Sequence, residues 1–77
     1  MHKELSKLQP GERAVVIKIT GSGPIHRRII DMGIVPGAKL KVEKFAPLGD
    51  PMEIKIKGFN LSLRKTEADT IQVEVAG

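Results

Sequence analysis

Apolar and polar residues alternate along most of this chain, and no other feature limits its possible folds as strongly. The alternating runs are "RAVVIKI", "AKLKV", "MEIKIK", "FNLSLR" and "TIQVEVA". A period of two puts every second side chain on the same face of a β-strand. The pattern therefore predicts five short strands. The inward-facing sets are Val15, Ile17 and Ile19; Ala38, Leu40 and Val42; Met52, Ile54 and Ile56; Phe59, Leu61 and Leu63; and Ile71, Val73 and Val75.

One segment, "SGPIHRRIIDMG", departs from the alternation. Its apolar residues Ile25, Ile29 and Met32 have helical spacing. A serine and a glycine precede Pro24, which suits the first position of a helix, and Gly33 suits a left-handed stop at the helix end. The sequence predicts one short helix, inserted after the first strand.

Five short antiparallel strands would expose long edges as a flat sheet, so we expect a small closed or nearly closed barrel. The alternation shifts by one residue at Gly58, which indicates a tight turn or bulge there. The chain has 77 residues, and we expect residues 1–77 to form a single domain with one modest core. The residues expected to be most deeply buried are Ile17, Leu40, Val42, Ile54, Leu61 and Val73.

The composition restricts the function classes. The chain has no cysteine, which excludes disulfides and thiolate metal sites. No apolar stretch is long enough for a signal peptide or a membrane span, so we expect a cytoplasmic protein. The formal net charge of +4 and the pI near 9.7 would suit a polyanion partner. However, Phe45 and Phe59 are the only aromatic residues, which is too few for a base-stacking platform, and we expect no nucleic-acid partner.

No set of residues predicts catalysis, a cofactor or a metal centre. The imidazole and carboxylate groups that could bind a divalent metal are His26, Asp31, Asp50 and Glu53, and their spacing matches no known ligand pattern. His26 and Asp31 are five residues apart on the predicted helix and so point to different sides. Asp50, in "LGDP", has a simpler interpretation, because its carboxylate can accept a backbone hydrogen bond and hold the turn before Pro51.

The basic residues Lys39, Lys41, Lys55 and Lys57 are predicted to project from the outer face of two neighbouring strands. Lysines in this position commonly protect a sheet against aggregation, which is the simpler interpretation. The same side chains would also attract an acidic partner or an anionic membrane surface.

Leu48, at the tip of the loop "APLGDP", is unusual because no turn type requires an apolar residue there. Either Leu48 folds back and plugs the open end of the barrel, or it protrudes as an apolar anchor for a partner. The predicted helix offers a companion surface. Its apolar residues cover too wide an arc to face one thin core, so we expect Ile29 to be partly exposed.

The segments "RRIIDMGIVPGAKLKV" and "APLGDPMEIKIKGFNLSLRKTEADTIQV" resemble the FeoA family, the small cytoplasmic proteins of bacterial ferrous iron uptake. The resemblance is specific, because "DMGIVPGA", "APLGDP" and "LSLRKTEA" occur together in this order. It implies an SH3-like barrel that catalyses no reaction. It also implies a partner, the cytoplasmic part of the FeoB membrane GTPase transporter, through which alone the chain would contact the membrane.

A protein without chemistry of its own must act through a surface, so the resemblance favours Leu48 as an anchor. We expect Ile29, Met32 and Leu48 to bind the partner. Two alternatives remain open at this stage. One is a small basic barrel that binds nucleic acid or another polyanion, and the other is a domain that binds divalent metal weakly.

Overall fold

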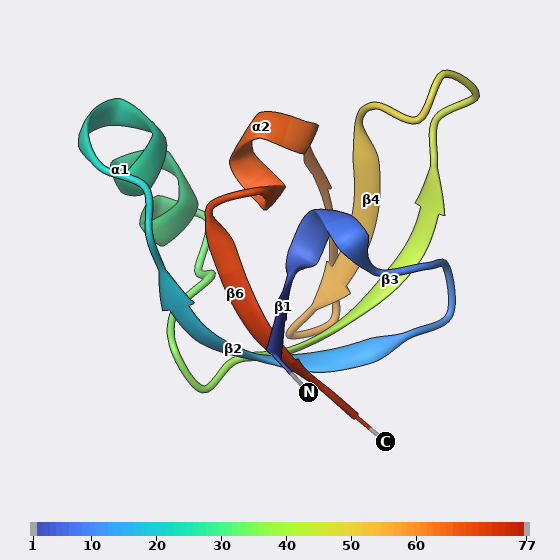
Figure 1. Cartoon of the computed structure of the whole chain (residues 1–77), viewed down its shortest axis with the longest axis horizontal. Helices are drawn as coiled ribbons and strands as arrows, with labels where there is room; N and C mark the ends of the chain where they lie inside the picture. Colours follow the sequence, from blue (N-terminus) through green and yellow to red (C-terminus); the bar gives the residue numbers. More distant parts are fainter. Residues whose placement is uncertain (1, 77) are drawn as a thin grey trace.

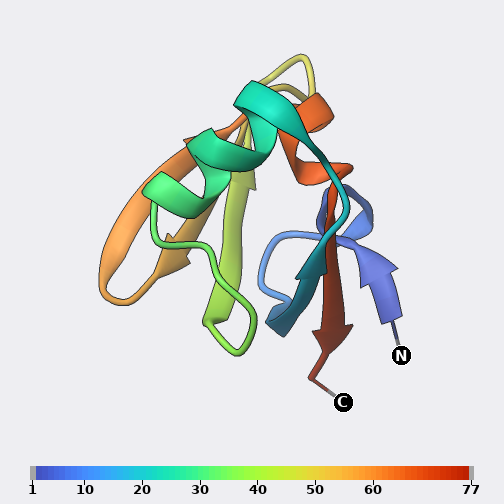
Figure 2. The same ribbon diagram turned by 90° about the vertical axis from the view of Figure 1, so that its left-hand side faces the viewer.

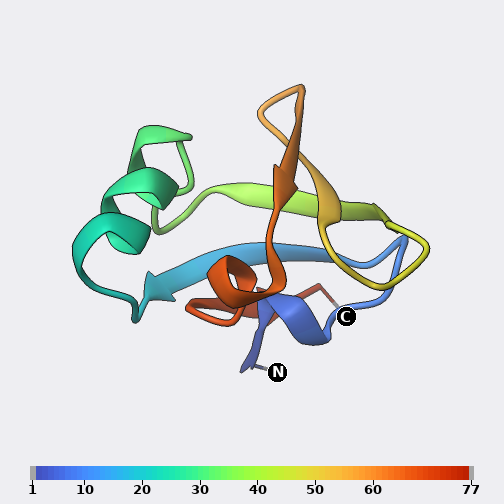
Figure 3. The same ribbon diagram turned by 90° about the horizontal axis from the view of Figure 1, so that it is seen from above.

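A computed structural model describes residues 2–76 as six antiparallel strands with two short α-helices (Figure 1). The strands are β1 (His2–Glu4), β2 (Arg13–Ile19), β3 (Lys39–Phe45), β4 (Met52–Ile56), β5 (Phe59–Leu63) and β6 (Ile71–Val75). The helices are α1 (Gly23–Asp31) and α2 (Lys65–Ala68), and a 3₁₀ turn, η1 (Leu5–Lys7), follows β1. Figures 1 and 3 show α2 lying between α1 and the loop that joins β3 to β4.

The strands form one sheet in the order β1-β6-β2-β3-β4-β5. This confirms the predicted all-β class. Six strands are present where five were predicted, and the predicted helix follows β2, which is the first of the five predicted strands. Within residues 2–76 the order has two ends, β1 and β5, so closure of the barrel is not established. β1 was not predicted, because "HKE" has no apolar alternation. Its place in the sheet comes from backbone pairing with β6, in the register His2↔Glu74.

The core is built from the inner faces of the strands together with residues of α1, η1 and the segment after α1. Four of the six residues expected to be most buried are buried, namely Leu40, Val42, Ile54 and Val73. The prediction is wrong for Ile17, which is 37% exposed, and Leu61 is only half-buried. The fully buried side chains with the largest volumes are Leu5, Leu8, Val16, Ile29, Ile34, Val42, Ile54, Leu63, Ile71 and Val73.

The inward-facing set of β2 differs from the prediction because the strand contains a bulge. Ala14 and Val16 face the core, whereas Val15 is only half-buried. The register with β6 shifts between Val16 and Lys18, which leaves Ile17 as the extra residue. A bulge residue is unpaired and reverses the phase of the residues after it. The shift returns Ile19 to the inner side, where it packs against the core.

The hairpin of β4 and β5 has the tight turn that was predicted at Gly58. Lys57 and Gly58 have φ values of 52° and 82°, the positive values that a two-residue type I′ turn needs. Phe59 pairs with Ile56 directly after this turn. It is nevertheless 70% exposed, so its assignment to the core was wrong. Figure 2 shows the reason, since this hairpin extends beyond the rest of the sheet and no other element covers its tip.

The helix α1 begins and ends as predicted, with Ser22 as its N-cap and Gly33 at φ 89° after its last turn. The prediction that Ile29 is partly exposed is wrong, because Ile29 is fully buried. The chain after the helix turns back over it, and the Ile34 amide donates a hydrogen bond to the Ile29 carbonyl at 3.2 Å. Ile25, one turn earlier, is 40% exposed instead. Neither helix within residues 2–76 has the length and apolar character required to cross a lipid bilayer.

Candidate interaction surface around Leu48

The loop between β3 and β4 holds Leu48 out in solvent. The Gly49 amide donates to the Ala46 carbonyl at 2.7 Å, and the Ala46 amide donates to the Pro51 carbonyl at 2.9 Å. These two bonds close a tight turn in which Gly49 has a φ of 87°, a value that favours glycine. Leu48 occupies the third position of this turn and is 96% exposed. The structure therefore excludes Leu48 as a plug of the barrel.

A shallow hollow of about 290 Å³ lies beside Leu48. Phe45 and Met52, which are cross-strand partners on β3 and β4, form its apolar part. Ser6 and Lys65 lie at its edge together with the loop itself. The protruding Leu48 can insert into a partner, and the apolar hollow beside it can accept an apolar side chain of that partner. Such an arrangement is typical of anchor residues in protein interfaces.

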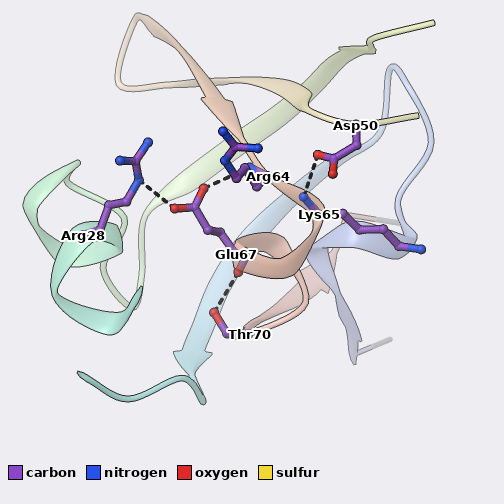
Figure 4. A network of polar contacts seen from close by, with 6 residues as sticks. All are labelled: Arg28, Asp50, Arg64, Lys65, Glu67 and Thr70. Atoms are coloured by element: carbon purple, nitrogen blue, oxygen red, sulfur yellow. Dashed lines mark hydrogen bonds and ion pairs between the residues drawn. The ribbon is translucent and has the colours of Figure 1, made fainter. Parts of the chain in front are cut away.

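Asp50 ties this loop to α2 (Figure 4). Its Oδ1 atom accepts a hydrogen bond from the Lys65 amide at 2.9 Å. The prediction that this carboxylate accepts a backbone hydrogen bond is confirmed, although the donor is 15 residues further along the chain. The bond closes the loop against the first residue of α2, so the position of Leu48 depends on a helix as well as on its own turn.

Glu67 is the central residue of the same network, as Figure 4 shows. Its side chain is 7% exposed, and its Oε2 atom lies 2.6 Å from Nε of Arg28 on α1. Its Oε1 atom accepts a hydrogen bond from the Arg64 amide at 2.9 Å. Its carbonyl accepts the Thr70 hydroxyl at 2.7 Å. A four-residue helix cannot be stable by itself, so these contacts are what hold α2 in place and join it to α1.

The 3₁₀ turn η1 completes the attachment of α2. The Ser6 hydroxyl donates a hydrogen bond to Oδ1 of Asp69, directly after the helix. Ser6 also lines the hollow beside Leu48. None of the contacts between α2 and its neighbours was predicted from the sequence, apart from the backbone hydrogen bond to Asp50. The signal that would have predicted part of it is the glutamate three residues after Arg64 in "RKTE", the spacing at which a side chain reaches back to the first amide of a helix.

The structure does not bring the three predicted partner-binding residues together. Leu48 is exposed, Met32 is half-buried against the core, and Ile29 is inaccessible. Figures 1 and 3 place α1 and the β3–β4 loop at opposite ends of the molecule, with α2 between them. A contact made by Met32 or by the exposed Ile25 of α1 would therefore belong to a different patch from Leu48.

The residues considered as metal ligands are also dispersed. Nδ1 of His26 lies 3.0 Å from the Gly21 carbonyl, and Asp50 is engaged by the Lys65 amide. Within residues 2–76, no three histidine or carboxylate side chains are grouped closely enough to hold a metal ion.

The FeoA domain model matches residues 3–75 of the chain. A Fe(2+) transport protein A/Fe(2+) transporter FeoB fusion protein of Porphyromonas gingivalis (strain ATCC BAA-308 / W83) is 41% identical over 71 residues, which cover 92% of this chain and 8% of that protein. This chain thus spans only a small part of that relative.

Two solved structures extend the comparison. Iron(II) transport protein A of Clostridium thermocellum is 45% identical with a TM-score of 0.90, over 95% of this chain and 45% of that one. FeoA of Stenotrophomonas maltophilia, described as a procaryotic SH3 domain protein and solved with zinc, is 27% identical with a TM-score of 0.80, over 96% of this chain and 89% of that one.

Proposed function

The chain belongs to the FeoA family, and from this premise we propose that it is a non-enzymatic accessory protein of ferrous iron uptake. Its partner is the cytoplasmic part of a FeoB-type transporter, which it binds and modulates from the cytoplasm through the apolar surface around Leu48. The family and the fusion protein support the role in ferrous iron transport. The residues that make the contact are our proposal.

The observation that carries the proposal is the 96% exposure of Leu48. An exposed leucine contributes no burial free energy to folding, because its side chain is as hydrated as in the unfolded chain. Yet the loop around it is ordered by two backbone hydrogen bonds and by the bond from the Lys65 amide to Asp50. A rigid loop that presents an apolar group loses little conformational entropy when that group is buried against a partner.

The fusion in Porphyromonas gingivalis supports the choice of partner. Joining two modules in one chain raises their effective concentration, often to the millimolar range for short flexible linkers. Such a fusion is useful where the two modules act on each other. Where the two modules are separate chains, affinity must take the place of the linker, and an apolar anchor beside an apolar hollow provides a means of binding.

Uptake of labelled ferrous iron by cells tests this function. Cells that lack the chain are compared with cells that express the unmodified chain, Leu48→Gln or the control Ile25→Gln. Ile25 is also an exposed apolar residue, but it lies on α1 at the other end of the molecule. We expect Leu48→Gln to behave like the absence of the chain and Ile25→Gln to behave like the unmodified chain. Uptake that does not depend on the chain at all would refute the accessory function.

A further inference from the structure

The two edges of the sheet differ in how well they are protected against pairing with a further strand. β1 is three residues long, and each residue of "HKE" has an ionisable side chain. β5 is longer, its sequence "FNLSL" contains no charge and no proline, and its register with β4 has no bulge. Shortness, charges, prolines and bulges are the common protections of an edge strand. β1 has two of these protections, and β5, as the structure describes it, has none.

The backbone of β5 has two residues whose polar groups point away from the sheet. Residues that flank a two-residue hairpin turn exchange both of their backbone hydrogen bonds, and this pattern repeats at every second pair of the ladder. Phe59 directly follows such a turn, so the residues of β5 that bond to β4 are Phe59, Leu61 and Leu63. The amide and carbonyl groups of Asn60 and Ser62 therefore face outward, and no group within residues 2–76 forms a hydrogen bond with them.

The inner side of this edge is apolar. Phe59 and Leu61 lie on the same side of the sheet as the buried Ile56 and Ile54, with which they pair. Phe59 is nevertheless 70% exposed and Leu61 is half-buried, because β5 is the last strand of the sheet. A strand added beside β5 would cover both side chains if its own apolar residues lay opposite them.

Positive charges flank the edge at both ends. Lys57 precedes β5, and Arg64 and Lys65 follow it. None of these three side chains forms an ion pair with a carboxylate of the described residues. β5 itself carries no charge, and the outward-facing Lys55 and Glu53 of the neighbouring β4 have opposite signs. The edge is therefore positive at both ends and neutral between them.

We propose that β5 binds an extended segment of a partner protein as a seventh, antiparallel strand of the sheet. The backbone of the segment bonds to Asn60 and Ser62, and its apolar residues, at alternate positions, cover Phe59 and Leu61. An acidic residue at each end meets the positive charges that flank the edge. β5 spans about 17 Å, so the segment has about seven residues with its acidic ends included. This proposal goes beyond the proposed function, because it does not involve the Leu48 anchor.

A second copy of the chain fits this edge less well. Two copies that paired antiparallel through β5, with Asn60 opposite Ser62, would have like charges at both ends of the ladder. Lys57 of each copy would lie beside Arg64 and Lys65 of the other. Like charges opposed across strands are destabilising, and each copy has a formal net charge of +4. The flanking charges thus disfavour self-association and favour a partner segment with acidic ends.

A synthetic peptide tests the proposal. It alternates three valines with two threonines, has a glutamate at each end, and is acetylated and amidated so that its termini carry no charge. When the peptide is bound as the seventh strand, its threonine amides face β5 and its valines face Phe59 and Leu61. We expect saturating peptide to slow hydrogen exchange of the Asn60 and Ser62 amides at least about tenfold, measured by NMR. The Leu61 amide, which already bonds to β4, should change less.

Three modified peptides are the controls. N-methylation of both threonine amides removes the donors that face β5, and N-methylation of two valine amides removes as many donors that face away. We expect the first peptide to bind at least about thirtyfold more weakly and the second to bind within about threefold of the unmodified peptide. A peptide with lysine at both ends should bind about tenfold more weakly at low salt. Equal losses from the two methylations, or equal binding of the lysine peptide, would overturn the proposal.

Variants of the chain complete the test. Phe59→Ser should weaken binding of the peptide about tenfold, whereas Ile25→Ser, at an exposed apolar residue of α1, should not change it. Leu48→Gln should bind the peptide as the unmodified chain does, and since the assay contains no transporter, its outcome is independent of the proposed function. If the peptide does not slow exchange of the Asn60 and Ser62 amides, the proposal is wrong. It is also wrong if their exchange slows with rising concentration of the chain alone, because the occupant would then be a second copy.

Discussion

Replacing Glu67 with glutamine tests whether one buried carboxylate joins α2 to α1. Glutamine has nearly the same shape, and its oxygen can still accept the bond from the Arg64 amide. Its amide group would then face Nε of Arg28, where the carboxylate oxygen now lies at 2.6 Å. One charge-assisted hydrogen bond is lost and one donor is left facing another donor. Arg28 is 61% exposed and can turn to water, so we expect a loss of about 2 kcal/mol in the free energy of unfolding, not more.

Urea denaturation and thermal melting measure this loss. For a domain of this size, about 2 kcal/mol corresponds to a fall of roughly 10 °C in Tm. The matched control is Glu43→Gln, because Glu43 is also paired with a basic side chain but lies in a more exposed position, at 3.8 Å. It should change stability by less than about 0.5 kcal/mol. If Glu67→Gln were as stable as Glu43→Gln, the buried carboxylate would not hold the two helices together.

Three further predictions concern the fold and the loop. Ile54→Asp should unfold the chain, measured by circular dichroism, because it puts an unpaired charge in the core, whereas the exposed Lys55→Asp should leave the chain folded. Gly58→Val should cost about 1 kcal/mol or more by urea denaturation, since a β-branched residue is strained at a φ of 82°. Asp50→Ala should increase the hydrogen-exchange rate of the Lys65 amide, measured by NMR, and should reduce the free energy of unfolding by about 1 kcal/mol or less. An unchanged exchange rate would show that the bond from the Lys65 amide to Asp50 does not secure the loop.

The sequence was sufficient to predict the strands whose inner and outer faces differ clearly. "AKLKV" and "MEIKIK" alternate between apolar residues and charged or polar ones, and their buried residues follow the prediction. In "RAVVIKI" four consecutive residues are apolar, so either phase is possible, and the bulge at Ile17 decides between them. A bulge is fixed by pairing with a distant strand and leaves no local pattern. The same is true of β1, which depends on backbone pairing with β6.

The candidate site was predictable only in part for a similar reason. Leu48 was identified because a single apolar residue at a loop tip violates local turn chemistry. Ile29 was assigned to the surface from the arc of the helix, but exposure depends on which part of α1 faces the sheet. Glu67 was overlooked because its importance comes from Arg28, which is 39 positions earlier in the sequence and adjacent only after folding. Local patterns identify residues that break a rule, and they do not identify distant partners.

The affinity of the Leu48→Gln variant for the soluble cytoplasmic part of FeoB is the most direct test of the proposed function, measured by titration calorimetry beside the unmodified chain. Because Leu48 is 96% exposed, its replacement should change the free energy of unfolding by less than about 0.5 kcal/mol. A central apolar anchor contributes at least about 2 kcal/mol to binding, so we expect Kd to rise about thirtyfold or more, at low and high salt alike. A stable Leu48→Gln variant that binds as tightly as the unmodified chain would contradict the role of Leu48 as the anchor.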